Sequence, residues 1–344
     1  MTTRHAIAWT ALGVALLATA LVPARVKPPA PRSPVRVGLV FDVGGRGDRS
    51  FNDAAYAGLL DAARADGVAF ELAEPAGAED REGALRLFAA RGFDLVIGVG
   101  YIFSRDMGEV ARVFPRVRFA CVDHAGDEPL PDNLAGLRFR EQEGSFLVGA
   151  AAGLESQSHH VGFVGGMNIE LIQRFEAGYR AGVLAVCPAC TVHVAYAGTT
   201  PDAFRDPLRG KAIAATQIAS GADLLFHAAG LTGSGVFEAA RAAGKHAIGV
   251  DRDQFDEAPE VVVTSMTKRV DTVVREAIHA VVDGSFKGGV RSFGVADQGV
   301  DWVHEGPHAA SLRPATIAAV EALRGRIASG EIKVPSRPPP SSPP

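Results

Sequence analysis

Three aspartates, Asp42, Asp123 and Asp251, each follow an apolar run of the chain. If these runs are parallel strands, their carboxyl ends meet at one crevice where ligands bind. Carboxylates accept hydrogen bonds from the neighbouring hydroxyls of a sugar, and Lys268 would balance their charge. Two of them could instead serve as a general acid and a general base, which would make the chain an enzyme. In a purely structural interpretation, Asp251 caps a turn and Lys268 is a surface charge.

The first aspartate opens a glycine-rich loop, DVGGRGDRSFN (42–52), that precedes a helical pattern. Asp48 or Ser50 can cap this helix. The loop lacks the spacing of a dinucleotide fingerprint, and the Asp42 carboxylate would repel a pyrophosphate. A neutral polyol fits better, with Asp42 and Asn52 as hydrogen-bonding partners. Phe51 offers a flat apolar surface for a ring, or is a core residue of the first helical turn.

Several segments taken together resemble a known protein family. They are DVGGRGDRSFN (42–52), FREQEGSFLVGAAAG (139–153), VGFVGGMNIELIQRFEAGYRAGV (161–183), GADLLFHAAGLTGSGVFEAA (221–240), IGVDRDQ (248–254) and TSMTKRVD (264–271). In this order, over residues 35–301, they resemble the basic membrane protein (BMP) family of ABC-transporter substrate-binding proteins, whose studied members include purine nucleoside receptors.

The resemblance implies an α/β fold of two Rossmann-like lobes with parallel sheets, joined by a three-crossover hinge (the type I periplasmic-binding-protein fold). We expect residues 35–157 and 265–290 in the N-terminal lobe. The C-terminal lobe would comprise 158–264 and 291–330, including a terminal helix. The residues themselves also favour this class, because helical patterns alternate with strand-like segments. These segments are Leu95–Val99, Val117–Asp123, Val161–Val164, Val192–Tyr196, Leu224–Ala228, His246–Val250 and Val261–Ser265.

The resemblance also implies a ligand and the residues that bind it. Family residues matching Asp123, Asp251 and Lys268 bind the sugar of a nucleoside, and Phe204 matches a second aromatic ring opposite Phe51. Two such rings would clamp a purine base. Leu231 stands where the family commonly has glycine, so the preferred base could differ. The predicted ligand-binding residues are Asp42, Phe51, Asn52, Asp123, Phe204, Gly230, Asp251 and Lys268.

Both ends of the chain differ in composition from its middle. Residues 1–24 combine an early positive charge with an apolar run and small residues, which is typical of a signal peptide or an N-terminal anchor. Residues 25–34 are a proline-rich linker, and residues 331–344 are predicted to be a disordered proline-rich tail. We therefore expect an exported protein, periplasmic or attached to the outer face of the cytoplasmic membrane.

The cysteines and one histidine leave several interpretations open. Cys187 and Cys190 form C-P-A-C, which suits a local disulfide, a redox dithiol or half of a zinc site. An exported protein favours the disulfide, and no second cysteine pair completes a zinc site. Cys121 lies in an apolar run and is expected in the core. His227 either lines the pocket or is a hydrogen-bonded core histidine.

Charge and motifs exclude some functions. The net charge of −4 provides no basic field for nucleic acid. The chain lacks G-x-S-x-G, H-E-x-x-H and Walker motifs, so we expect no catalysis and no cofactor. The favoured function is a monomeric binding protein that passes a nucleoside to an ABC permease and its ATPase. The alternatives are a sensing module for a membrane receptor and a nucleoside-acting enzyme on the same scaffold.

Overall fold

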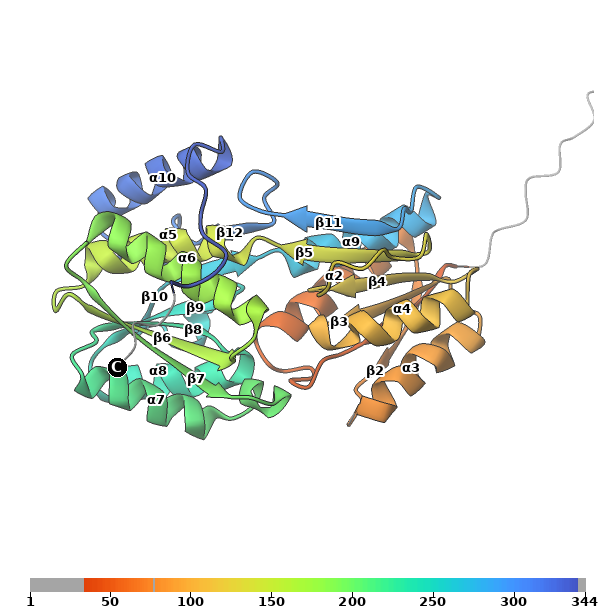
Figure 1. Ribbon diagram of the computed structural model, residues 1–344, viewed down its shortest axis with the longest axis horizontal. Helices are drawn as coiled ribbons and strands as arrows, with labels where there is room; N and C mark the ends of the chain where they lie inside the picture. The colour runs from red at the N-terminus through yellow and green to blue at the C-terminus, as the bar shows by residue number, and fades with distance from the viewer. Residues whose placement is uncertain (1–33, 77, 340–344) are drawn as a thin grey trace, which may run out of the picture. The chain divides into compact units, whose positions relative to one another are not determined.

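The computed structural model describes residues 34–76 and 78–339, and these residues form two α/β lobes (Figure 1). Each lobe contains one six-stranded sheet with helices on both faces. The predicted two-lobe architecture with parallel sheets is confirmed. The signal peptide or anchor predicted for 1–24, and all but the last residue of the linker predicted for 25–34, lie outside the described residues.

The N-terminal lobe is built on an all-parallel sheet whose central strands are buried because helices cover both faces. Helices α2 (Phe51–Asp66) and α9 (Val270–Val282) cover one face, and α3 (Ala78–Ala90) and α4 (Ser104–Val113) cover the other. The strands, in spatial order, are β11 (Gly289–Phe293), β5 (Leu134–Phe139), β4 (Arg118–Val122), β3 (Leu95–Val99), β1 (Arg36–Val40) and β2 (Ala69–Ala73).

The C-terminal lobe repeats this arrangement, except that its edge strand β12 runs antiparallel to β10. Helices α5 (Glu141–Glu155), α6 (Glu170–Val186) and α10 (Pro314–Ala328) lie on one face, with α7 (Pro207–Ala219) and α8 (Gly233–Ala242) on the other. The strands, in spatial order, are β12 (Val300–Trp302), β10 (Val262–Lys268), β9 (His246–Asp251), β8 (Leu224–Ala228), β6 (His160–Met167) and β7 (Thr191–Gly198).

The chain crosses between the two lobes after β5, after β10 and after β11, and these positions differ from the predicted boundaries. The first prediction, at residue 157, is wrong because α5 packs against α6, β10 and β12 of the C-terminal lobe. The predicted boundaries at 265 and 290 fall inside β10 and β11. An apolar helix face does not reveal which of two similar sheets it covers, so the sequence pattern could not locate the first crossing.

Helices α5 and α6 approach each other closely through glycines. A Cβ atom added to Gly149 would lie 2.3 Å from the carbonyl oxygen of Tyr179. Added to Gly182, it would lie 2.0 Å from the carbonyl oxygen of Phe146. Such distances are far shorter than a carbon–oxygen contact allows, so these positions require glycine for the two helices to pack. The contact holds α5, the first element after the hinge, on the C-terminal lobe.

The segment after α10 is ordered as far as it is described, which corrects the prediction of a disordered tail from residue 331. Ile332 and Val334 pack against the main hydrophobic core, and the Ile332 amide donates to the Arg326 carbonyl at 3.1 Å. Arg337 lies 3.9 Å from Glu170 of α6. Apolar packing and a backbone hydrogen bond therefore hold this segment. Residues 340–344 lie outside the described part of the chain.

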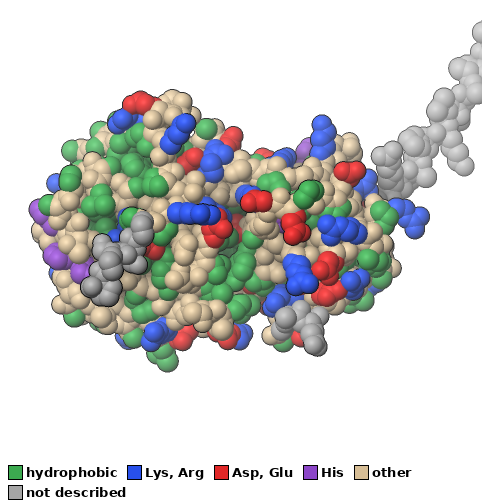
Figure 2. All heavy atoms as spheres, viewed as in Figure 1, with side chains coloured by type: hydrophobic (Ala, Val, Ile, Leu, Met, Phe, Trp, Pro, Cys, Tyr) green, Lys and Arg blue, Asp and Glu red, His purple; other side chains and the backbone are tan. Residues whose placement is uncertain are grey.

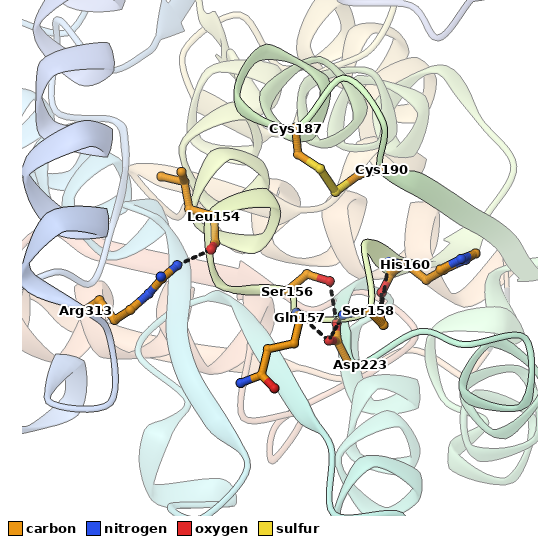
Figure 3. Close-up of a disulfide and its surroundings, with 9 residues drawn as sticks. All are labelled: Leu154, Ser156, Gln157, Ser158, His160, Cys187, Cys190, Asp223 and Arg313. Atoms are coloured by element: carbon orange, nitrogen blue, oxygen red, sulfur yellow. Dashed lines mark hydrogen bonds between the residues drawn. A yellow bond between two sulfur atoms is a disulfide. The ribbon is translucent and has the colours of Figure 1, made fainter.

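A disulfide joins Cys187 and Cys190 in the turn between α6 and β7 (Figure 3). Its Cα atoms are 5.3 Å apart, within the range of ordinary disulfides. The bond therefore closes the turn at the end of C-P-A-C rather than presenting a free dithiol. Cys121 is a buried free thiol, and the prediction of a core residue is confirmed.

Candidate functional site

A cavity lies between the two lobes, at the carboxyl ends of the strands. The structure brings all of the predicted ligand-binding residues to its lining. The N-terminal lobe contributes Asp42, Phe51, Asn52 and Asp123, and the C-terminal lobe contributes Phe204, Gly230, Asp251 and Lys268. Their role in binding stays a prediction. The lining also includes residues that the sequence analysis missed, among them Asp48, Tyr101, Leu171, Ile172 and Phe175.

Asp123 and Asp251 reach the cavity from an unusual backbone conformation. Their φ angles are 59° and 67°, in the left-handed region that favours glycine. Aspartate is one of the few other residues that adopts this conformation, at a cost of about 1 to 3 kcal/mol. Asp123 directly follows the buried strand β4, and Asp251 is the last residue of the buried strand β9. These strands hold the two turns in place. Local strain of this kind is typical of binding sites.

Lys268 is the centre of a buried ion-pair network. Its ammonium nitrogen lies 2.7 Å from the Asp123 carboxylate and 3.1 Å from Glu141, and only 1% of its side chain is exposed. Arg174 donates to Glu141 at 2.7 Å. Burial alone would lower the pKa of Lys268, but the carboxylates of Asp123, Glu141 and Asp251 hold that pKa above its usual value. The lysine therefore stays charged beside the cavity and is no surface residue.

Glu141 and Arg174 escaped the sequence analysis, although both lie in segments that resemble the family. The available signal was a charged residue in the first turn of α5 and another in the second turn of α6, but both helices carry further charged residues, so this signal was weak. Burial acts against the ionised form of Glu141, but Lys268 and Arg174 lower its pKa overall. Burial raises the pKa of Asp123 despite Lys268. Glu141 is thus the ionised partner that keeps the lysine in position.

Two other carboxylates in the cavity have no such cation in direct contact among the described residues. Burial raises the pKa of Asp251 to about 6, and Lys268 and a hydrogen bond from the Ser50 hydroxyl only partly offset this effect. Burial likewise raises the pKa of Asp42 to about 7. The Val43 amide donates to Asp42 at 2.6 Å. The remaining carboxylate oxygens can accept hydrogen bonds from a hydroxyl-bearing ligand. These hydrogen bonds would replace the ones to water that the carboxylates lose on burial.

The side chain of Asn52 is largely occupied within the loop. Its carbonyl oxygen accepts from the Asp42 amide at 3.1 Å, and its nitrogen donates to Asp48 at 2.9 Å. Asp48 also accepts from the amides of Ser50, Asn52 and Asp53, so it is Asp48 and not Ser50 that caps α2. The side-chain oxygen and nitrogen of Asn52, both expected to bind the ligand, therefore fix the shape of the glycine loop instead. One hydrogen of the side-chain amide is left to donate to a ligand.

The two predicted aromatic rings lie on opposite lobes. Phe51 is the first residue of α2, and it is half-buried between the cavity and the core. Phe204 ends the short 3₁₀ helix η3 (Pro201–Phe204). Its ring packs on the backbone of Gly166, where an added Cβ would lie 2.3 Å from the ring. Leu231 does not line this cavity; it lines a separate depression beside it.

His227 is a core histidine and does not line the cavity. Its ring is completely buried, packs edge-on against Phe237 and lies 3.2 Å from the side-chain oxygen of Gln254. Burial lowers the pKa of His227 to about 4, so the ring is neutral at physiological pH. The open choice between pocket and core is therefore settled for the core.

Within residues 34–76 and 78–339, no helix is long and apolar enough to cross a membrane. No group of histidine, cysteine and acidic side chains in this part of the chain could hold a metal ion. On the face shown in Figure 2, acidic and basic side chains are interspersed, with no continuous basic patch. This distribution agrees with the net charge of −4 in giving no support to nucleic-acid binding.

Comparison with known proteins agrees with this arrangement. Residues 35–337 match the Bmp family model, described as ABC transporter substrate-binding protein PnrA-like. The CD4+ T-cell-stimulating antigen of Listeria monocytogenes is 36% identical over 323 residues, covering 88% of both chains. The ABC transporter nucleoside-binding protein BmpA of Lactococcus lactis is 30% identical over 331 residues, covering 89% of this chain and 90% of BmpA. Other relatives are named as lipoproteins or basic membrane proteins, in keeping with export and attachment to a membrane.

The solved structure of an ABC transporter solute-binding protein from Aeropyrum pernix superposes with a TM-score of 0.80 at 31% identity, covering 88% of this chain and 94% of that one. The shared fold is the type I periplasmic-binding-protein fold. Proteins of this kind bind a solute for a permease and its ATPase and are not enzymes, so the enzyme hypothesis is set aside. The chain belongs to the PnrA-like (Bmp) family of ABC transporter substrate-binding proteins.

Proposed function

We propose that the solute is a nucleoside with a purine base. The observation that carries this proposal is the pairing of two features in one cavity: aromatic rings from opposite lobes, and a cluster of carboxylates around a buried lysine. The name of the Lactococcus lactis relative, a nucleoside-binding protein, supports the same class of ligand.

The two features match the two halves of a nucleoside. Phe51 and Phe204 would stack on the base, and stacking contributes about 1 to 3 kcal/mol per base while tolerating different bases. Asp123 and Asp251 would accept hydrogen bonds from the ribose hydroxyls. Lys268 would donate to a ribose oxygen and limit repulsion between the acids. Closure of the lobes would then place the ligand between groups from both sheets.

The proposed function includes transport of the bound nucleoside. The protein would be exported, capture the nucleoside as a monomer and deliver it to the permease and ATPase of an importer. The apolar N-terminal segment would either be removed or retained as an anchor on the outer face of the membrane.

Titration calorimetry on the full-length chain tests the ligand. Guanosine, adenosine and inosine should bind with high affinity, and cytidine and uridine more weakly because their rings offer less area for stacking. Free purine bases should bind more weakly than their nucleosides, and ribose alone should give no measurable heat. Tight binding of a sugar or an amino acid, with no heat from any nucleoside, would refute the proposal.

A further inference from the structure

A second set of contacts joins the lobes outside the cavity. It connects Arg49, in the glycine loop of the N-terminal lobe, to the segment after β9 in the C-terminal lobe. The side-chain nitrogen of Gln254 donates to the carbonyl oxygen of Arg49 at 3.0 Å. The Arg49 guanidinium pairs with Glu257. Arg49, Gln254 and Glu257 do not line the cavity.

We propose that Gln254 and Arg49 form a latch that stabilises the closed arrangement of the lobes and thereby sets ligand affinity without touching the ligand. This inference rests on the part of the proposed function in which the lobes close around a solute. It does not depend on that solute being a nucleoside. Both residues act as positioning residues.

Gln254 is held in one orientation by the C-terminal lobe. It is 4% exposed, and its side-chain oxygen accepts from the Val250 amide at 2.8 Å. The same oxygen lies 3.2 Å from the Nε2 atom of the neutral His227 ring. Because an amide oxygen can only accept, this contact requires the proton of the ring to be on Nε2. These two donors require the oxygen to face the core. The amide nitrogen is left pointing toward Arg49 of the other lobe, as a donor positioned before the lobes meet.

The two contacts of the latch differ in how much they stabilise the closed arrangement. Arg49 is 67% exposed in its side chain, so its ion pair with Glu257 is screened by water and contributes little. The Gln254 hydrogen bond lies at the edge of the core, where a donor without a partner is costly. The amide bond is therefore the principal contact and the ion pair a secondary one.

A contact present only in the closed form increases the population of that form. Apparent affinity falls in proportion when the population of the binding-competent state falls. Because closure is common to all ligands, loss of the latch should weaken every ligand by the same factor. A residue inside the cavity would instead change the preference among ligands.

Gln254→Glu is the decisive variant in the full-length chain. It keeps the size of the side chain and the acceptor for Val250, but an ionised carboxylate cannot donate to the Arg49 carbonyl. By titration calorimetry we expect affinities for guanosine, adenosine and inosine that are all about tenfold weaker at pH 7.5. Affinity within twofold of the wild type would overturn the latch, as would a loss for one nucleoside only.

A second set of variants covers the case in which Gln254→Glu folds poorly. Arg49→Glu should weaken binding about threefold through repulsion with Glu257, and the exchanged pair Arg49→Glu with Glu257→Arg should recover it. Arg46→Ala is the matched control, because Arg46 pairs with Glu74 in its own lobe at 2.7 Å. Failure of the exchanged pair to recover affinity, or an equal loss in Arg46→Ala, would count against the latch.

Small-angle X-ray scattering separates this inference from the choice of ligand. If the wild type binds no nucleoside, the proposed function fails. The radii of gyration of the ligand-free proteins then decide whether the latch exists. A larger radius of gyration for ligand-free Gln254→Glu than for ligand-free wild type would support it, because more molecules would be open. Equal radii in that case would overturn it.

Discussion

At the level of single residues, the cavity holds carboxylates in different electrostatic states. Asp123 and Glu141 share the buried ammonium of Lys268, whereas the Asp251 carboxylate accepts from the Ser50 hydroxyl and, in the described part of the chain, contacts no cation. A buried carboxylate without a close cation favours its protonated form. The site is thus prepared for a ligand that donates hydrogen bonds, and its ligand-free stability should depend on pH.

The first prediction concerns the pH dependence due to Asp251. Its pKa rises from 3.8 to about 6 on folding, so between these values the native state binds more protons than the unfolded state. The free energy of unfolding should therefore fall as pH rises from about 4 to about 6, by at most about 3 kcal/mol from this group. Asp251→Asn should lack this component. Urea unfolding of both proteins at pH 4.5 and 7 measures it, and equal pH dependence would contradict the assignment.

The second prediction concerns the aromatic rings. Phe51→Ala and Phe204→Ala should each weaken purine nucleosides and free purine bases by similar factors, about 5-fold to 150-fold, because both classes of ligand stack. Phe70→Ala, on β2 and outside the cavity, is the control and should leave affinity unchanged. Calorimetry provides the affinities. A loss restricted to ligands that carry ribose would show that the rings do not hold the base.

At the level of secondary-structure elements, helix packing decides how the hinge is built. The first crossing precedes α5, and glycines bring α5 into close contact with α6. The glycines of EAGYRAGV in α6 are visible in the sequence, but their partner is not. Only the folded chain shows that Gly182 faces the Phe146 carbonyl.

The third prediction tests this helix contact. Gly182→Ala should lower the free energy of unfolding by about 1 to 3 kcal/mol or more, because its Cβ would overlap the backbone of α5. Gly325→Ala in α10 is the matched control, since an added Cβ there meets nothing within 4 Å. It should stabilise the protein by up to about 1 kcal/mol through higher helix propensity. Denaturant unfolding compares the two, and equal effects would refute the packing argument.

Strand predictions succeeded where apolar residues were continuous. β3 and β8 have the predicted bounds, and both are buried along their whole length. β2 and β11 lie at sheet edges and are largely half-buried or exposed, so their apolar pattern is weak. β5 is buried but was not recognised, and β12 is only three residues long. Edge position and short length thus explain most of the missed strands.

At the level of the whole molecule, the last described residues complete the core of the C-terminal lobe. Ile332 and Val334 pack against the hydrophobic cluster that includes α5 and α6. The tail therefore returns to the same face of the sheet that the hinge helix covers. Composition alone predicted disorder, because proline and serine dominate the final residues.

The fourth prediction concerns this tail. Ending the chain after Gly330 should lower the free energy of unfolding by about 1 to 3 kcal/mol, because two partly buried apolar side chains are lost. Ending it after Pro339 retains these contacts and is the control. Thermal and urea unfolding of the two shortened chains measure the difference. Identical stability would mean that the packing of residues 331–339 contributes nothing.

The sequence by itself determined the family through its ordered motifs, the two-lobe α/β architecture, and eight of the residues that line the cavity. The aspartates among these eight could be found because strand ends carry their polar residues to one crevice whatever the details of packing. Tertiary structure alone decided how those residues are used. Asn52 is engaged within its loop, His227 lies in the core, and Glu141 with Arg174 completes the ion-pair network. These outcomes depend on which side chains meet across elements distant in sequence. Residue type and spacing along one chain do not contain that information.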